Sequence, residues 1–182
     1  MRMPRLTSIF CAIAIALGAV AHAADPHIAA PEVPAALQPP AGQVAFLEAH
    51  AKGVQIYECT AKADAPPSFE WKLSGPEATL ADAAGKPIGK HYAGPTWAAN
   101  DGSSVVGEVK ARDQGPDSKA VPWLLLSAKE THGSGLLSAT RSVQRIHTVG
   151  GVAPAQACDA AHVKQVVRSD YSATYYFYRD GR

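Results

Sequence analysis

The stretch from Gly85 to Ser103 constrains the fold most, because turn residues divide it into short extended pieces. The sequence Asp82-Ala83-Ala84-Gly85 predicts a turn into a strand at 87–93, and Gly94-Pro95 ends that strand. Asn100-Asp101-Gly102-Ser103 predicts a further turn. Such closely spaced turns set the path of the backbone, so polar side chains here point in set directions. This stretch is therefore the best candidate surface for a functional site.

The rest of the chain shows the same extended character. Alternating or apolar runs predict strands at 54–59, 69–73, 104–112, 120–128, 140–149, 163–167 and 171–178. Residues 120–128 are apolar on both faces, as in a fully buried strand, although their three leucines leave a helix as the rival interpretation. In 54–59, Gln55, Tyr57 and Cys59 share one face. In 69–73, the alternation predicts that Phe69, Trp71 and Leu73 are buried.

Residues 43–50 suit either a short helix or a strand, and Gly53 favours a strand that leads into a second one. There is no internal repeat and no long helical period. Short strands with a turn signal about every ten residues predict an all-β fold. We expect a single antiparallel β-sandwich or barrel-like domain over residues 44–182.

The N-terminus carries the features of a secretory signal peptide. Arg2 and Arg5 precede an apolar run, and Ala21-His22-Ala23 follows it, so cleavage is expected after Ala23. Residues 24–43 hold five prolines and predict an extended arm or linker. We expect the mature chain of 159 residues to be exported to the periplasm or the cell exterior.

Charge and cysteine content limit the classes of partner and predict a disulfide. The mature chain would hold 15 basic and 16 acidic residues without a basic stripe, which argues against a nucleic-acid partner. No apolar segment after the signal reaches the length of a membrane span. Cys59 and Cys158 would be the only remaining cysteines, and two cysteines in an exported chain most often form a disulfide. A redox pair or half of a metal site is the alternative.

Several short motifs follow one another along the chain in the order typical of a known family. They are Gly53–Cys59, Pro76-Glu77-Ala78, Gly89 through Trp97 to Asp101-Gly102-Ser103, Gln144-Arg145, Thr148–Gly151 and Ala153-Pro154. With them the chain resembles the domain-of-unknown-function 3455 family (DUF3455) of exported bacterial and fungal proteins. The resemblance implies secretion, pairing of Cys59 with Cys158 and a mostly β domain. It implies no activity.

The residues best suited to chemistry are His91 and Asp101, ten positions apart across the Gly-Pro break. Hairpin geometry could join them as a base and its orienting carboxylate. The plainer interpretation, which we prefer, is that Asp101 only locks an Asp-Gly turn. No nucleophile motif, phosphate-binding glycine loop or dinucleotide fingerprint is present. The six histidines beyond the signal lack metal-ligand spacing, so no metal and no cofactor are expected.

Two further features can each be interpreted either as part of a binding site or as ordinary structure. Arg141, Arg145 and His147 share a predicted strand face, either as a solvated surface or as an anion site. Trp97 could form the apolar floor of a small-ligand site, although core packing is the simpler role. Trp71 and Trp123 are expected in the core.

We therefore expect a non-enzymatic module that binds a small molecule or an envelope component. The candidate ligand-binding residues are His91, Tyr92, Trp97, Asp101, Ser103, Gln55 and Arg145. The alternative is a hydrolase or lyase in which His91 acts as general base, supported by Asp101 or Arg145.

Overall fold

The fold is a closed antiparallel barrel in which each strand pairs with the next along the chain and the last pairs with the first. The computed structural model describes residues 28–63 and 68–181, so the predicted signal peptide lies outside the described residues. The strands are β1 (Gln43–Ala61), β2 (Phe69–Ala81), β3 (Pro87–Tyr92), β4 (Thr96–Ala99), β5 (Ser104–Asp113), β6 (Trp123–His132), β7 (Ser142–Gly150) and β8 (Val166–Asp180). The predicted all-β class is confirmed, and of its two forms the structure is the barrel.

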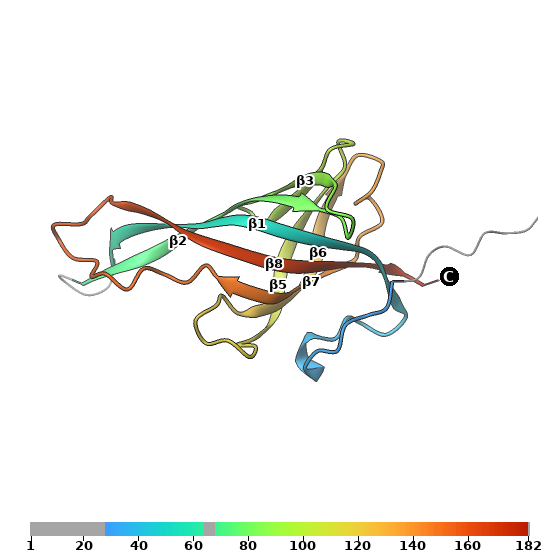
Figure 1. Cartoon of the computed structure of the whole chain (residues 1–182), viewed down its shortest axis with the longest axis horizontal. Coiled ribbons are helices and arrows are strands. Elements are labelled where there is room, and N and C mark those ends of the chain that lie inside the picture. The colour runs from blue at the N-terminus through green and yellow to red at the C-terminus, as the bar shows by residue number, and fades with distance from the viewer. Residues whose placement is uncertain (1–27, 64–67, 182) are drawn as a thin grey trace, which may run out of the picture.

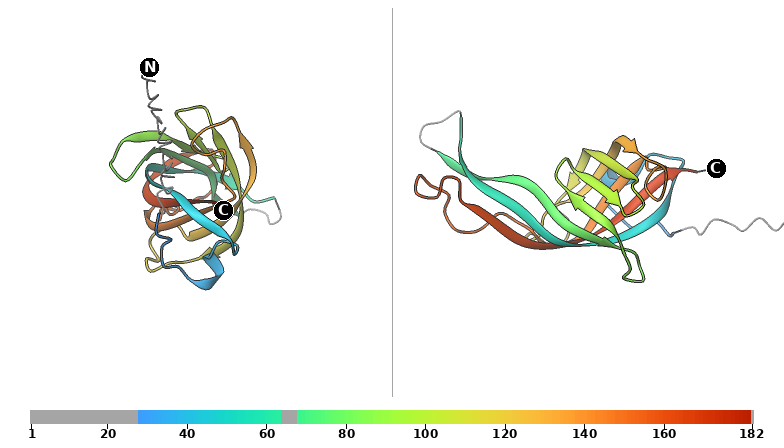
Figure 2. Two further views of the ribbon diagram at one scale, coloured as in Figure 1. Left: turned by 90° about the vertical axis from the view of Figure 1, so that its right-hand side faces the viewer. Right: turned by 90° about the horizontal axis from the view of Figure 1, so that it is seen from above.

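Three strands are much longer than the barrel needs. β1 has 19 residues, β2 has 13 and β8 has 15, whereas β3 and β4 have 6 and 4. Their far ends pair only with one another and form a sheet that projects from one end of the barrel (Figure 1). The view from above in Figure 2 shows the same projecting sheet beyond the barrel strands. The barrel mouth on this side therefore opens onto the inner face of the projecting sheet.

The barrel interior is filled by side chains from alternate positions of the strands, as the period of two requires. Leu47, Ala49 and Ala51 enter from β1, and the aromatic residues enter mainly from β8 and β4. The buried cluster includes Leu80, Trp97, Val105, Leu126, Val143, Tyr171, Tyr175 and Phe177. Gly107 has no side chain because a Cβ there would lie 2.9 Å from the Trp97 ring. The Trp97 indole therefore leaves no room for a side chain at position 107 of β5.

The described part of the proline-rich arm, residues 28–43, packs against the outside of the barrel. It contains a short 3-10 turn, η1 (Ala35–Leu37), which contacts β5 and β6. Leu37 is completely buried, and its carbonyl accepts a hydrogen bond from the Gln144 amide. Ile28 and Val33 pack on an outer cluster with Ile146 and Tyr178. The arm is therefore a part of the packed structure.

A disulfide joins Cys59 of β1 to Cys158, as predicted. It anchors the segment 151–165, which crosses the inner face of the projecting sheet. Further contacts hold this segment in place: the Trp71 indole donates to the Gln156 carbonyl, and the Lys164 amide donates to the Cys59 carbonyl. The segment therefore covers part of a sheet face that has no opposite barrel wall.

Some local predictions were wrong. Residues 43–61 form one continuous strand, because both edges of β1 find partners along its length and Gly53 lets Ala78 of β2 approach closely. Leu73 is 48% exposed, although the alternation predicted burial, because its end of β2 lies beyond the barrel. Trp71 and Trp123 are only partly buried. The strand predicted at 163–167 begins only at Val166, so residues 163–165 are not part of it.

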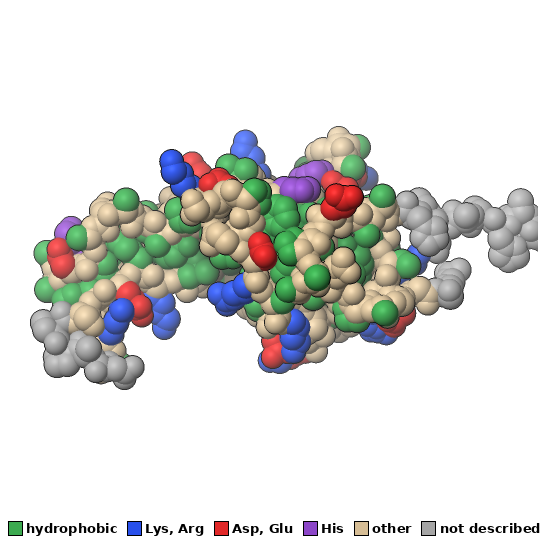
Figure 3. Space-filling view, turned by 90° about the horizontal axis from the view of Figure 1, so that it is seen from below, with side chains coloured by type: hydrophobic (Ala, Val, Ile, Leu, Met, Phe, Trp, Pro, Cys, Tyr) green, Lys and Arg blue, Asp and Glu red, His purple; other side chains and the backbone are tan. Residues whose placement is uncertain are grey.

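The projecting sheet and the segment 151–165 also expose large apolar side chains. Leu73, Val163 and Val166 are between 40% and 55% exposed. The space-filling view in Figure 3 shows apolar side chains along this end of the molecule. Within the described ranges, no helix has the length and apolar character needed to cross a membrane.

Candidate ligand site at the mouth of the barrel

A cavity of about 330 Å³ lies at the barrel mouth, where β3 and β7 end and the projecting sheet begins. Its polar lining comes from Gln55 and Tyr57 of β1, Ser74 of β2, His91 of β3, Arg112 of β5 and Arg145 of β7. Its apolar wall consists of Leu73, Pro76, Ala93, Pro95, Val109, Val121, Pro122 and Leu124. This volume and mixed lining are typical of sites for small organic molecules, which often lie in the mouths of β-barrels.

Gln55 is the most unusual residue of the cavity. Its side chain is 1% exposed, yet neither its amide nitrogen nor its oxygen has a hydrogen-bond partner in the structure. A buried amide left in this state costs about 1–3 kcal/mol. The stem of this side chain packs against Gly151, since a Cβ on Gly151 would lie 3.0 Å from Gln55 Cγ. One donor group and one acceptor group are therefore held in place at the cavity lining.

His91 is almost completely buried and held by three contacts. Its Nδ1 lies 2.8 Å from the Thr96 carbonyl oxygen, its ring stacks on Trp97 at 4.5 Å, and the edge of Tyr175 packs against it at 5.1 Å. A carbonyl oxygen only accepts, so Nδ1 carries the proton and Nε2 is a lone-pair acceptor. Burial lowers the pKa of His91 to about 3, and Arg145 adds to this effect while the Thr96 bond opposes it. The imidazole is therefore neutral at physiological pH.

Arg145 is the half-buried cation of the site. Its Nε and Nη2 atoms both donate to the Pro122 carbonyl, at 3.1 Å and 2.7 Å, which fixes the plane of the guanidinium. The positive charge opposes the rise in pKa that burial causes in Tyr57, Tyr171 and Tyr175. Among the described residues, no carboxylate forms an ion pair with Arg145.

Two tyrosines of β8 lie behind these groups. The hydroxyls of Tyr171 and Tyr175 are 3.2 Å apart and both are buried. The Tyr57 hydroxyl donates to the Gly151 carbonyl at 2.8 Å, which connects the cavity wall to the segment that follows β7. The polar side of the site is thus supported by a layer of ordered aromatic residues.

The structure brings together three of the predicted candidates: Gln55, His91 and Arg145. Trp97 is 1% exposed and supports the His91 ring from below, so it is a core residue directly under the site. Tyr92 is 45% exposed and does not line the cavity.

Asp101 and Ser103 lie in the turn at the other end of β4. The Asp101 carboxylate accepts from the Ser103 amide, the Ser103 hydroxyl and the Leu136 amide, at 2.9, 2.6 and 2.7 Å. These bonds lower the pKa of Asp101, the Ser103 hydroxyl most of all. The described residues show no hydrogen bond between Asp101 and His91, whose Nδ1 is committed to Thr96. The carboxylate locks its turn and fastens it to the loop before β7.

The predicted cationic row on β7 is not formed. A bulge between Ile146 and Val149 changes the alternation, and His147 adopts a positive φ of 48°. Arg141 pairs with Asp180, and His147 packs edgewise against Trp123. Arg145 alone of the three reaches the cavity.

Sequence reasoning missed Tyr57, Arg112, Tyr171 and Tyr175. For Tyr57 a signal existed, because it shares a strand face with Gln55 two residues earlier. The two β8 tyrosines are four residues apart and also share a face, but only barrel closure places them behind Arg145.

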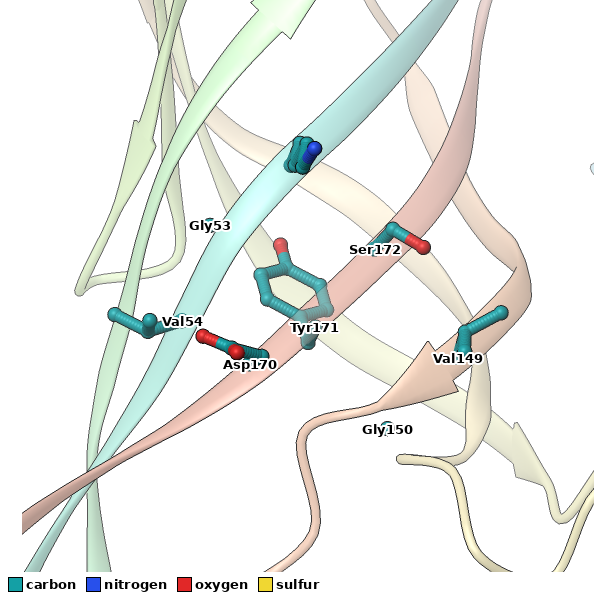
Figure 4. Close-up of a pocket in the computed structure, with 8 residues that line it drawn as sticks. Gly53, Val54, Val149, Gly150, Asp170, Tyr171 and Ser172 are labelled. Atoms are coloured by element: carbon teal, nitrogen blue, oxygen red, sulfur yellow. The ribbon is translucent and has the colours of Figure 1, made fainter.

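A second, larger hollow of about 430 Å³ lies on the outer surface between β1, β7 and β8 (Figure 4). Gly53, Val54, Asp170, Tyr171 and Ser172 are among the residues that line it. None of its lining residues has a buried polar atom without a partner. It is therefore a weaker candidate than the mouth cavity. Over residues 28–63 and 68–181, no cluster of three or more metal-ligating side chains is found.

The fold and the cavity define the molecule as an eight-stranded antiparallel β-barrel with an amphipathic cavity at one mouth. The family described as "Protein of unknown function (DUF3455)" matches residues 40–179. The chain belongs to this family, which confirms the resemblance seen in the sequence. No curated protein and no solved structure matches the chain.

Proposed function

We propose that this protein is a non-enzymatic binding module that holds a small organic molecule in the cavity at the barrel mouth. One observation carries the proposal: the amide of Gln55 is buried at the cavity, packed in place and without a partner for either polar atom. An occupant that hydrogen-bonds this amide offsets the cost of its burial. An eight-stranded barrel is also of the size that holds one small ligand.

The chemistry of the cavity favours binding over catalysis. An effective general base has a pKa near the operating pH, whereas burial lowers that of His91 to about 3. The only cysteines in the described residues form the disulfide, so no thiol nucleophile faces the cavity. A rigid neutral imidazole is well suited to accepting a hydrogen bond from a ligand.

We propose that the module works outside the cytoplasm, in the periplasm or at the cell surface. A disulfide that closes a long loop is typical of exported proteins. The N-terminal sequence supports export independently.

The test is a fragment screen on the mature protein by two-dimensional nuclear magnetic resonance. We expect binders to shift the side-chain amide signals of Gln55 and the ring signals of His91. Gln144 offers an internal reference, since its amide is buried but bonded to Leu37 and Tyr178 away from the cavity. Shifts confined to Ser172 and Val149 at the outer hollow, or no binders at all, would contradict the proposal.

A further inference from the structure

We infer that the cavity selects organic acids: the carboxylate lies beside Arg145, and an apolar body lies along the opposite wall. This inference rests on the proposed function and adds the class of ligand to it.

The charge of the cavity is the first argument. Its lining contains two guanidinium groups, Arg112 at the exposed rim and Arg145 at half-buried depth, and no aspartate or glutamate. His91 is neutral, so it cannot compete with them for an anion. A guanidinium without a carboxylate partner, in a partly dehydrated site, binds carboxylates through charge-assisted hydrogen bonds.

The geometry of Arg145 is the second argument. Two of its five N–H groups are used on the Pro122 carbonyl, through Nε and Nη2, and the guanidinium also forms a hydrogen bond with the Tyr175 hydroxyl. The remaining donors belong to a group whose plane is already fixed, so little side-chain entropy is lost when a ligand binds. The site is ordered before the ligand arrives.

The position of Gln55 is the third argument. A Cβ on Gly151 would touch both Gln55 Cγ and Val121 Cγ1, at 3.0 Å and 3.2 Å, so Gln55 lies next to the Val121-Pro122 segment that anchors Arg145. The unpartnered Gln55 amide and the Arg145 guanidinium therefore lie at the same end of the cavity. The amide N–H groups donate to the oxygens of the acid, and the amide oxygen accepts from a hydroxyl where the acid carries one.

The apolar wall sets the nature and size of the body. Leu73, Val109, Leu124 and Pro95 present aliphatic surface without any polar requirement. The volume of about 330 Å³ accommodates roughly ten non-hydrogen atoms at ~30 Å³ each, the share of a water molecule in the liquid. A medium-chain aliphatic acid or a single-ring aromatic acid fits this space.

Matched probes test the inference by calorimetry and by the Gln55 and His91 signals. Octanoate represents the aliphatic source and 3-phenylpropionate the aromatic source, and octan-1-ol and octanamide carry the same apolar body without charge. We expect at least one acid to bind about tenfold or more tightly than the neutral probes, because hydrogen bonds to charged groups contribute about 1.5–3 kcal/mol. The acid that binds better identifies the source of the ligand.

Three variants separate charge from structure. Arg145→Gln should weaken acid binding about 10-fold to 100-fold and leave the neutral probes almost unchanged, whereas Arg145→Lys should restore part of the preference. Arg141→Gln removes an exposed arginine outside the cavity, so it should bind acids like the natural chain. Thermal unfolding of each variant checks that it is folded.

The outcomes are distinguishable. If octan-1-ol and octanamide bind as tightly as both acids in the natural chain, the cavity binds ligands and the acid inference is wrong. If none of the four probes shifts Gln55 or His91, the acid inference is also wrong, and the fragment screen then decides the proposed function by itself. The probe series uses the natural chain, so it tests the preference for acids even if Arg145→Gln does not fold.

Discussion

At the scale of single residues, two buried glutamines differ in whether their side-chain amides are hydrogen-bonded. Gln144 has both ends satisfied, because its nitrogen donates to the Leu37 carbonyl and its oxygen accepts from the Tyr178 hydroxyl. Gln55 is equally buried and has neither bond. Four buried polar side-chain atoms lack a partner in the described part of the chain, and two of them belong to Gln55. The proposed role of Gln55 in binding accounts for this difference.

Substitution of each glutamine by leucine should therefore have opposite effects. Gln55→Leu removes an unsatisfied amide while keeping the volume, so the ligand-free protein should be unchanged or about 1 kcal/mol more stable. Gln144→Leu breaks two buried hydrogen bonds and leaves their partners unsatisfied, which should cost about 2–4 kcal/mol. Denaturant unfolding of both variants measures the difference. An equal loss of stability in the two variants would show that Gln55 has structural partners.

His91 should dominate the acid sensitivity of the fold. Its pKa is about 3 in the folded protein against an ordinary value of 6.5. Between these two pH values the unfolded chain therefore binds a proton at this residue and the folded chain does not. Its contribution to stability is complete above pH 6.5. It is lost as the pH falls toward 3, at about 1.4 kcal/mol for each pH unit.

His91→Phe retains a ring that can stack on Trp97 and removes the titration. We expect the variant to lose most of the decline in unfolding free energy between pH 7 and pH 4.5, measured by denaturant titrations across that range. His132→Asn changes a histidine at an exposed position and serves as the control, which should follow the natural chain. An unaltered slope in His91→Phe would assign the acid sensitivity to other groups.

At the scale of elements, the arm before β1 behaves as a part of the barrel. Leu37 is 0% exposed, and its carbonyl satisfies a buried amide of β7. Leu37→Ala should cost about 2–5 kcal/mol, the range for truncation of a buried leucine. Leu136→Ala provides the matched control, because Leu136 is 37% exposed and its truncation should change stability by less than about 0.5 kcal/mol. Equal stability of the two variants would mean that the arm leaves the barrel in solution.

The elements also show what the sequence could predict. Alternation placed Gln55, Tyr57 and Cys59 on one face, and in the structure all three are buried. The same rule failed at Leu73, because alternation indicates which face a residue shares and not whether that face is covered. It failed on β7 because the bulge at His147 has no local signature in the sequence. Strand existence depends on short-range pattern, whereas burial depends on what lies opposite.

At the scale of the whole molecule, closure of the barrel creates the site. Gln55, His91 and Arg145 lie on β1, β3 and β7, and none of these strands pairs with another of the three. Their meeting depends on the pairing of β1 with β8 and on the curvature of the sheet. All three were candidates on chemical grounds, but no spacing in the sequence could show that they share one cavity. The alternative of a His91–Asp101 pair relied on nearness along the chain, but the two residues lie toward opposite ends of the β3–β4 hairpin.

The disulfide connects the closed barrel to the candidate site. It anchors the segment 151–165, in which Gly151 packs on Gln55 and accepts the Tyr57 hydroxyl. It spans 99 residues of sequence, for which chain entropy gives at most about 4.7 kcal/mol of stabilisation. Cys158 lies outside the paired strands, so no strand pairing of the barrel runs through the disulfide. Its removal should therefore lower stability and loosen the segment while the β-barrel persists.

The double variant Cys59→Ser, Cys158→Ser tests this division of roles. We expect an unchanged far-ultraviolet circular dichroism spectrum and a loss of up to about 4.7 kcal/mol in unfolding free energy. Acid probes should bind more weakly, because a loosened Gly151 no longer holds Gln55 in place. Alkylation of the native, unreduced natural chain should reveal no free thiol, which checks that the disulfide is complete. Full loss of β structure in the double variant would show that the barrel itself needs the disulfide, and undiminished ligand affinity would show that the segment 151–165 does not organise the site.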